Sequence, residues 1–192
     1  MTFKKSSAKF MALIIALFTF SSATQAGALI EPYLGYGIGS GDRNNTDYDY
    51  NTPQFGARLG YQMLGLMGGI DYSLAPEFDL EAETAGSTSK IDTDKNQLGL
   101  FVGYEFPILL RAWATYYLSS KLETTSATAT TEYSGGGYAL GVGFTGLPFV
   151  SLNLEYRMFS YDEVETGSFK GDLDPELELN EIFLSVSLPL NI

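Results

Sequence analysis

The sequence predicts an all-β fold, namely one eight-stranded antiparallel transmembrane β-barrel with a polar, plugged interior. Three observations predict it. The chain opens with an export signal, eight of its segments alternate between apolar and polar residues, and the connections between these segments are alternately short and long. Alternation with a period of two is typical of strands whose two faces meet different surroundings. Short turns at one end and long loops at the other are typical of membrane barrels.

The first residues have the order of a secretory signal peptide. Lys4, Lys5 and Lys9 precede an apolar run over residues 10–20, and the small-residue tract SSATQAGA follows. This order predicts cleavage after Ala26 or Ala28. The apolar run is too short to span a bilayer as a helix. We therefore assign residues 1–26 to the leader and residues 27–192 to the barrel domain.

Composition excludes several classes of function. Removing the leader takes away three of the 11 Lys and Arg residues, which leaves 8 against 23 Asp and Glu and a net charge of −15. The basic footprint of a nucleic-acid-binding protein is therefore missing. The sequence contains no cysteine and no histidine, which removes disulfides, thiolate chemistry, the usual general base and the commonest metal ligand. No cofactor and no enzymatic activity are expected.

Eight segments alternate, and each is close to the 9–11 residues that a tilted membrane strand needs. Short connections lie at residues 64–65, around Pro107 and at residues 147–148. The other connections, residues 41–52, 76–95, 121–134 and 162–179, are polar and are predicted to be long loops. The alternating segments lie near residues 28–40, 53–63, 66–75, 96–106, 109–120, 135–146, 149–161 and 180–190.

One face of every segment is apolar, and no charged residue interrupts it. Aromatic residues on this face lie toward the two ends of the segments, and aliphatic residues fill the middle. Two aromatic girdles around an aliphatic band are expected where a barrel crosses the two interfaces of a bilayer. The predicted girdles are Tyr36, Phe55, Tyr72, Tyr116, Tyr138 and Tyr156 toward the long loops, and Tyr61, Tyr104, Phe106 and Phe144 toward the short turns.

The opposite face of the segments carries the charged residues. In the stretch LNLEYRMF, residues 152–159, Glu155 and Arg157 alternate with leucine, tyrosine and methionine. An arginine that faced lipid near the midplane would cost roughly 2–4 kcal/mol. We therefore expect these charges to point into the barrel, where side chains fill the interior of an eight-stranded barrel.

Turn lengths predict which charges meet inside. The two-residue turn at 64–65 places Arg58 across from Asp71, and a three-residue turn at 107–109 places Glu105 across from Arg111. Opposite charges on facing strands are favourable neighbours, and a buried network of charges has to be almost fully paired. The predicted lumenal ion-pair network comprises Glu31, Arg58, Asp71, Glu105, Arg111, Glu155 and Arg157.

The leader, the eight alternating segments and the last strand, EIFLSVSLPLNI, carry a resemblance to a family. The mature chain resembles the small eight-stranded outer-membrane β-barrel proteins, of the kind of the OmpA transmembrane domain and OmpX. Members usually end in an aromatic residue, whereas this chain ends in Ile192 and has Pro189 in its last strand. The resemblance implies that this strand is the signal read by the barrel-assembly machinery, through Ile182, Leu184, Val186, Leu188, Leu190 and Ile192.

The expected function is that of an integral protein of the bacterial outer membrane with a structural and surface-interaction role. The alternative is a narrow channel for water or small solutes. A lipid-modifying barrel enzyme is a third possibility, and the missing histidine argues against it. Without histidine, acid–base catalysis would depend on carboxylates, and Asp71 and Glu105 are the only serious candidates in the lumen.

Outer-membrane lipid, lipopolysaccharide and the assembly machinery are the expected partners, and no nucleic acid is expected. The predicted loops at 76–95 and 162–179 are acidic. Divalent cations are a further expected partner there, because hard cations prefer oxygen ligands. The simpler reading of these loops is a solvated surface whose charges repel one another. The spacing of the carboxylates matches no calcium-binding loop.

Overall fold

The computed structural model describes residues 26–125 and 129–192, so the predicted leader lies outside the described residues up to position 25. Among the described residues no helix is long and apolar enough to cross a membrane. The chain forms strands β1 (Gly27–Arg43), β2 (Thr46–Met63), β3 (Leu66–Thr84), β4 (Ser87–Phe106), β5 (Leu110–Thr125), β6 (Thr130–Phe144), β7 (Ser151–Thr166), β8 (Phe169–Ser187) and β9 (Leu190–Asn191).

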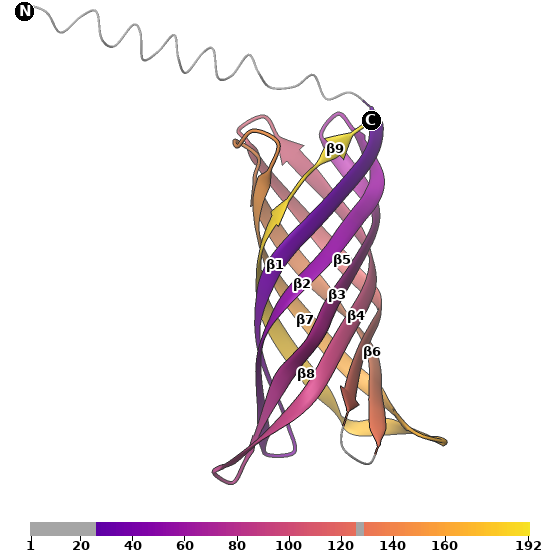
Figure 1. The fold of residues 1–192 in the computed structure, drawn as a ribbon. Coiled ribbons are helices and arrows are strands. Elements are labelled where there is room, and N and C mark those ends of the chain that lie inside the picture. Colours follow the sequence, from indigo (N-terminus) through magenta and orange to yellow (C-terminus); the bar gives the residue numbers. More distant parts are fainter. Residues whose placement is uncertain (1–25, 126–128) are drawn as a thin grey trace, which may run out of the picture.

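Each strand pairs antiparallel with the next, and β8 pairs with β1 to close the barrel (Figure 1). The short strand β9 continues β8 beyond Pro189 and also pairs with β1. Proline lacks a backbone N–H and therefore interrupts the ladder, but Leu188 on its other side still donates to the carbonyl of Pro32 at 2.9 Å. The predicted eight-stranded antiparallel barrel is confirmed, with its last strand in two pieces.

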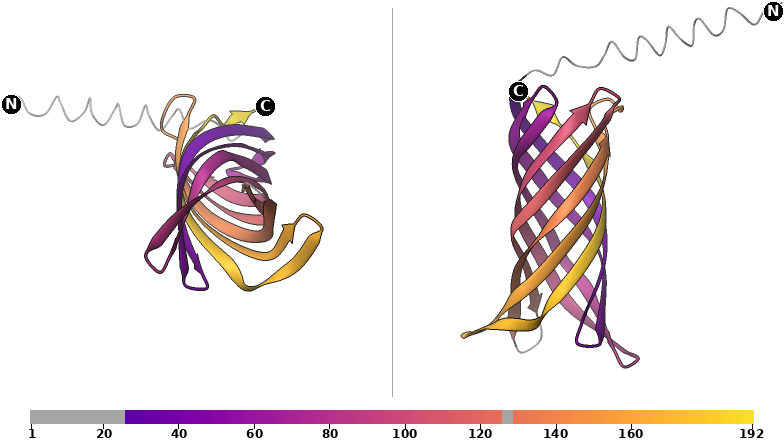
Figure 2. Two further views of the ribbon diagram at one scale, coloured as in Figure 1. Left: turned by 60° about the horizontal axis from the view of Figure 1, so that its bottom comes forward. Right: turned by 180° about the vertical axis from the view of Figure 1, so that it is seen from behind.

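Strands β1 to β8 are much longer than predicted, from 15 residues in β6 to 20 in β4. The prediction of long loops at 41–52, 76–95 and 162–179 is wrong. These segments extend the neighbouring strands and close with two-residue turns at 44–45, 85–86 and 167–168. In the segment 121–134 the described residues up to Thr125 and from Thr130 are strand as well. The barrel is correspondingly tall, with the start of β1, the C-terminus and the short turns at one end (Figures 1 and 2).

We call the end with the short turns 64–65, 107–109 and 145–150 the turn end, and the opposite end the hairpin end. Several tight turns use positive φ at both central residues, for example 52° and 62° at Asn44 and Asn45, and 51° and 80° at Ala85 and Gly86. This is the geometry of type I′ turns, whose twist matches that of the strands. It lets the hairpins close without a loop.

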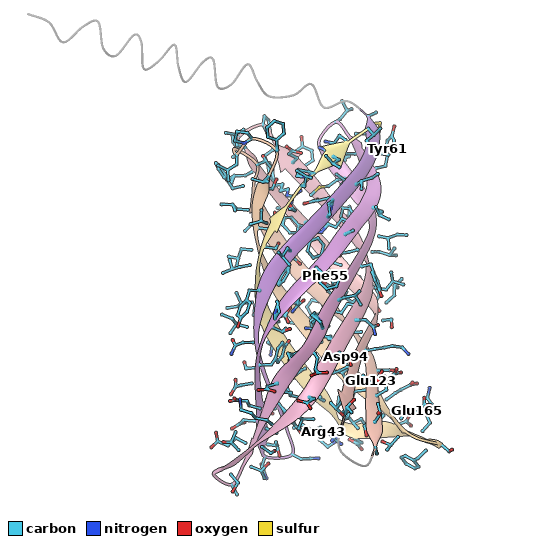
Figure 3. The ribbon with its side chains drawn as sticks, viewed as in Figure 1. Arg43, Phe55, Tyr61, Asp94, Glu123 and Glu165 are labelled. Atoms are coloured by element: carbon cyan, nitrogen blue, oxygen red, sulfur yellow. The ribbon has the colours of Figure 1, made fainter. Side chains whose placement is uncertain are left out.

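The polarity of the strands inverts along the barrel. In the half toward the turn end, Ile70 and Tyr72 of β3 are exposed and Asp71 between them is buried; further along the same strand Leu80 is buried and Asp79 and Glu81 face outward. Tyr61 lies near the turn end, Phe55 near mid-height, and Asp94, Glu123 and Arg43 in the other half (Figure 3). The outer surface therefore changes from apolar to acidic along the height of the barrel.

β-Bulges accompany this change. The ladder shifts register between Tyr50 and Phe55, between Ala75 and Phe78, and at comparable positions in the four following strand pairs. A bulge lets a strand switch which residues face inward. In β3 the bulge brings Phe78 and Leu80 into the interior after Ala75.

The two halves of the interior are filled differently. Toward the turn end, a small apolar cluster of Leu29, Met67, Phe101 and Trp113 packs among charged side chains, which are described below. The hairpin half is filled by a second apolar cluster that comprises Tyr50, Ala75, Phe78, Leu80, Tyr117, Leu122, Ala139, Phe159, Tyr161, Leu173, Leu177 and Leu179. The predicted polar interior therefore holds for the half toward the turn end, and the hairpin half packs like a soluble barrel.

We predict that Gly141→Ala destabilises the barrel. A Cβ at Gly141 in β6 would lie 2.2 Å from a ring atom of Trp113, so the indole has to move from its packed position. Overpacking of this kind costs about 1–3 kcal/mol, measurable by urea unfolding in lipid vesicles. Gly68→Ala is the matched control, because its nearest neighbour would be the carbonyl oxygen of Phe101 at 3.3 Å. Equal stability of the two variants would contradict the prediction.

Candidate functional site

A layer of charged side chains in the interior is electrically balanced. Eight charged side chains are buried, each at most 3% exposed, and they are four cations and four anions. They come from every strand of the barrel except β6 and β9. The members of this layer, which we call the charged layer, are Glu31, Arg58, Asp71, Lys95, Arg111, Glu155, Arg157 and Glu181.

At the turn end of the charged layer, Arg111 binds Glu31 through two hydrogen bonds. Its Nη1 donates to Oε2 at 2.9 Å, and its Nη2 donates to Oε1. Nη2 also donates to Asn153 at 2.7 Å and to Ser187 at 3.0 Å. Oε1 of Glu31, which accepts from Nη2 of Arg111, also lies 3.5 Å from Nη1 of Arg58. Glu31 therefore joins two arginines from two other strands.

Arg58 is the centre of the charged layer. Its Nε donates to Asp71 at 3.1 Å and its Nη2 to Glu155 at 2.5 Å. Tyr33 donates its hydroxyl proton to the second oxygen of Asp71 at 2.6 Å. The guanidinium lies over the rings of Trp113 and Tyr33, at 4.5 and 5.0 Å from their centroids, where cation–π attraction adds to the ion pairs.

Arg157 extends the charged layer toward the hairpin end. Its Nε donates to Glu155 at 3.0 Å, and its Nη1 donates to Glu181 at 3.2 Å and to Gln54 at 2.9 Å. The guanidinium carbon lies 3.8 Å from the centroid of the Phe183 ring. One ring face and two carboxylates therefore surround this arginine.

The layer ends at Glu181, one oxygen of which accepts three hydrogen bonds. Lys95 donates at 2.6 Å, Gln54 at 2.7 Å and the Tyr50 hydroxyl at 2.9 Å. The ammonium of Lys95 also lies 5.1 Å from the ring centroid of Phe159, which belongs to the apolar cluster of the hairpin half. Ion pairs thus run without interruption from Arg111 to Lys95, and the apolar cluster of the hairpin half follows beyond Lys95.

The strand without a charge in this layer, β6, supplies space. A Cβ at Gly143 would lie 2.8 Å from Nε of Arg111 and 2.6 Å from the side-chain oxygen of Asn153. The glycines at positions 141 and 143 therefore make room for Trp113 and Arg111. In an eight-stranded barrel the interior is only wide enough for side chains to fill it, so long side chains on one strand require small residues on its neighbour.

The structure brings six of the seven predicted network residues together, and Glu105 is the exception. Its backbone pairs with Arg111 as predicted, but the Arg111 side chain reaches Glu31 instead. Glu105 is half-buried near the turn end and accepts a hydrogen bond from Gln62 at 2.8 Å. The prediction that Glu105 joins the network is wrong, because barrel closure brings Glu31 within reach of the guanidinium.

Two members of the charged layer were missed. Lys95 lies in the segment 76–95 that was predicted to be a loop, and Glu181 lies at the start of the last alternating segment and was not included in the predicted network. The signal for Lys95 is its spacing, since it lies two residues before Gln97 and four before Gly99 on the same side of β4. Extending the alternation beyond the apolar rows would have placed it inside.

The predicted outer features lie on the outer surface. All ten girdle aromatics are exposed, as are the six residues of the predicted assembly signal. Leu188 is the least exposed of that row and Ile192 the most. The row remains on one side because β9 resumes pairing with β1 after Pro189.

The hairpin end carries almost all of the net charge. Of the 23 acidic residues, four belong to the charged layer and Glu105 lies near the turn end. The other 18 lie in residues 41–52, 76–95, 121–134 and 162–180. The basic residues in these segments outside the charged layer are Arg43, Lys90, Lys121 and Lys170. Within the described residues no group of three or more acidic side chains is arranged to hold a metal ion. The expectation of divalent cations therefore gains no defined site.

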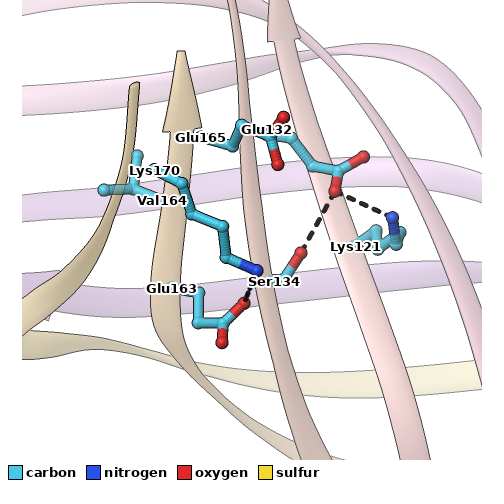
Figure 4. A pocket seen from close by; sticks show the side chains of 7 residues that line it. All are labelled: Lys121, Glu132, Ser134, Glu163, Val164, Glu165 and Lys170. Carbon is cyan, nitrogen blue, oxygen red and sulfur yellow. Dashed lines mark hydrogen bonds and ion pairs between the residues drawn. The ribbon is translucent and has the colours of Figure 1, made fainter. Parts of the chain in front are cut away.

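A charged cavity of about 270 Å³ lies between the hairpins at this end (Figure 4). Lys121 donates to Glu132 at 2.8 Å, and the two form an ion pair; Lys170 lies 2.8 Å from Glu163. The hydrogen bond from Lys121 holds the pKa of the Glu132 carboxyl below its usual value, and the bond to Glu163 raises the pKa of Lys170. Both lysines are thus engaged, and Glu165 adds further negative charge to the wall.

Comparison with known proteins identifies the same architecture. A family model described as the outer membrane protein beta-barrel domain matches residues 12–186. Neisserial surface protein A superposes with a TM-score of 0.56 at 14% identity and covers 83% of this chain and 96% of its own. OprG from Pseudomonas aeruginosa gives 0.55 at 11% identity over 88% and 98%.

Ail, the attachment invasion locus protein of Yersinia pestis, solved with the heparin analogue sucrose octasulfate, gives a TM-score of 0.53 at 15% identity over 85% of this chain and 99% of its own. At these identities the likeness is one of fold. A search among curated proteins gave no match.

We predict that Arg58→Met strongly destabilises the barrel. The substitution leaves Asp71 and Glu155 without their shared cation, and an uncompensated buried charge costs about 3–5 kcal/mol. Urea unfolding in lipid vesicles measures the loss. Lys90→Met is the control, since Lys90 forms only exposed ion pairs with Asp79 and Glu81, and should leave the unfolding midpoint unchanged. A small loss for Arg58→Met would show that the charged layer contributes little to stability.

Proposed function

Since this chain belongs to the outer membrane protein β-barrel domain family, we propose that it serves the bacterial outer membrane as a non-enzymatic barrel that stabilises the membrane and makes contacts at the cell surface. In this proposal residues 1–26 are removed as a signal peptide, the turn end faces the periplasm and the hairpin end faces outward. The acidic hairpins then project from the cell.

The observation that carries the proposal is the sealed interior. The charged layer is balanced, its ion pairs are continuous, the Trp113 ring packs against two of its arginines, and an apolar cluster fills the hairpin half. A permeant ion would have to separate buried pairs at short distance, where a low dielectric makes electrostatic interactions strong. A protein with no open path through its lumen acts through its outer and end surfaces.

The buried carboxylates favour a structural over a catalytic role. Asp71 is fully buried and is held by Arg58 and Tyr33, so a substrate could not reach it without unfolding the interior. Glu105 is half-buried and is bound by Gln62. Two carboxylates that share acid–base work need a common substrate site, and these two face different surroundings. The absence of histidine and cysteine from the sequence supports the same proposal.

Charge favours a cationic class of surface partner. The hairpin end has 18 acidic side chains and four basic ones, and complementary potentials steer association and reject ligands of the same sign. Ail was solved with a heparin analogue, a polyanion; an acidic hairpin end repels such a ligand. We therefore propose polycations, such as basic peptides or proteins, as the partners of the hairpin end.

Two further partners belong to the proposal. The assembly machinery would read the outward apolar row that ends at Leu190 and Ile192, and lipopolysaccharide would surround the outer half of the apolar belt. Divalent cations would bridge outward carboxylates to anionic lipid in a diffuse way, since electrostatic attraction to a charged surface does not require a fixed cage.

Conductance in a planar bilayer tests the sealed interior. We predict that the wild-type protein gives no conductance steps, and that Arg157→Ala, which leaves Glu155 and Glu181 in excess, admits small cations. Lys90→Ala, which changes only an exposed ion pair, is the control and should be as silent as wild type. Stable, reproducible steps from the wild-type protein would instead favour a narrow channel for water or small solutes.

Binding to proteoliposomes tests the class of surface partner. We predict that polylysine binds vesicles that expose the hairpin end and is released as salt rises from 0.1 to 1 M, because the screening length falls from about 10 to about 3 Å. Sucrose octasulfate should not bind at either salt concentration. Protein-free vesicles of the same neutral lipid are the control. Salt-sensitive binding of the polyanion would contradict the proposal.

A further inference from the structure

The short turns at the turn end expose large apolar side chains. Leu64 is 69% exposed, Ile108 60% and Phe149 86%, and one lies in each of the three turns 64–65, 107–109 and 145–150. These turns contain no charged residue. Exposed apolar groups that lie next to one another mark a contact surface more often than isolated ones do.

The same turns place bulky residues in a backbone conformation that is unfavourable for them. Leu64, Leu109 and Phe149 have φ of 53°, 63° and 67°, in the left-handed region that glycine and asparagine adopt at least cost. Each of the three turns therefore holds a bulky residue where a small or polar one would fit better. Where local sequence preference is broken in this way, a compensating interaction is expected.

The height of the apolar belt points to that interaction. The outward apolar rows span residues 53–63, 66–74, 98–106 and 110–118, which is 9–11 residues each. A tilted strand needs about 9–11 residues to cross the hydrocarbon region. The apolar rows are therefore long enough to cross the hydrocarbon region only if the residues next to the turns are included. No polar margin remains between the belt and the turn end.

The turns are fixed to the ends of the belt. Glu105 donates its backbone N–H to the carbonyl of Gly65 at 2.8 Å, and Thr145 donates to that of Leu109 at 2.8 Å. These bonds join successive turns to neighbouring strands. The charged residues nearest in sequence, Glu105 and Arg111, are turned to Gln62 and to Glu31.

We propose that the three short turns are a lipid-binding surface, embedded in the periplasmic leaflet of the outer membrane, which sets the depth of the barrel. The acyl chains, near the lipid headgroups, contact the side chains of Leu64, Ile108, Leu109 and Phe149. The transfer of these side chains out of water compensates for the strain in the turns. The inference rests on the membrane location of the family and on the proposed orientation, and it does not depend on the sealed lumen or on a surface ligand.

The two ends of the barrel provide a matched pair of turns. Leu64 and Gly65 at the turn end have φ of 53° and 83°, and Ala85 and Gly86 at the hairpin end have 51° and 80°. The backbone is thus the same, while the side chain is leucine at one end and alanine at the other. A change to asparagine eases the left-handed conformation at both positions, so any difference between the two variants reports the surroundings.

Urea unfolding of the protein purified from outer membranes and reconstituted in phosphatidylcholine vesicles provides the first test, with fluorescence of the single tryptophan as the signal. We expect Leu64→Asn to shift the folding equilibrium toward the unfolded form by roughly tenfold or more, since a leucine leaves an apolar environment. Ala85→Asn should be neutral or stabilising. If Leu64→Asn behaves like Ala85→Asn, the turn lies in water and the proposal is overturned.

The second test measures the depth of the turns in the membrane, and it can be made even if Leu64→Asn fails to fold. The chain has no cysteine, so Phe149→Cys and Ala85→Cys each carry one environment-sensitive fluorophore. At position 149 we expect strong quenching by nitroxides on the lipid acyl chains and shielding from aqueous iodide, and the reverse at position 85. Quenching by iodide at position 149, or shielding from both quenchers as in a protein–protein contact, would overturn the proposal.

Discussion

The fold depends on one constraint, that charges inside an eight-stranded barrel have neither water nor room. Four cations and four anions therefore neutralise one another in a single layer, and each guanidinium is held by carboxylates and covered by aromatic rings. The same constraint explains why β6 carries glycine where its neighbours carry tryptophan and arginine. Replacing one member would leave its partners charged and unpaired, which costs more than the pair itself contributes.

On the hairpin side of the charged layer, polar side chains face outward and apolar side chains fill the interior. The outer surface there meets water instead of lipid, so the carboxylates of Asp79 and Glu81 face outward and Leu80 faces inward. The strands keep their pairing through this change, with bulges near the border. One continuous sheet thus serves two solvents, which makes the hairpins firm extensions of the barrel and holds their acidic side chains well outside the membrane.

A sealed lumen leaves two end surfaces and the lipid-facing belt as the parts that interact. The hairpin end is strongly acidic, and the turn end is apolar and conformationally strained. The asymmetry favours a single orientation and a defined depth, because the charged end cannot enter the bilayer and the apolar end gains by doing so. Stability, orientation and surface contact then arise from the same distribution of side chains.

The sequence by itself determined the membrane barrel, the outward rows and the pairing of Arg58 with Asp71, because period-two alternation and turn length are local properties. It misassigned the hairpins as loops, because the alternation inside them is inverted and an acidic strand such as EFDLEAET reads as polar when only outward apolar rows are sought. Only the tertiary structure decided that Arg111 binds Glu31 and that Lys95 and Glu181 complete the layer. These contacts join strands far apart in the chain, and they form only when β8 meets β1 and the barrel closes.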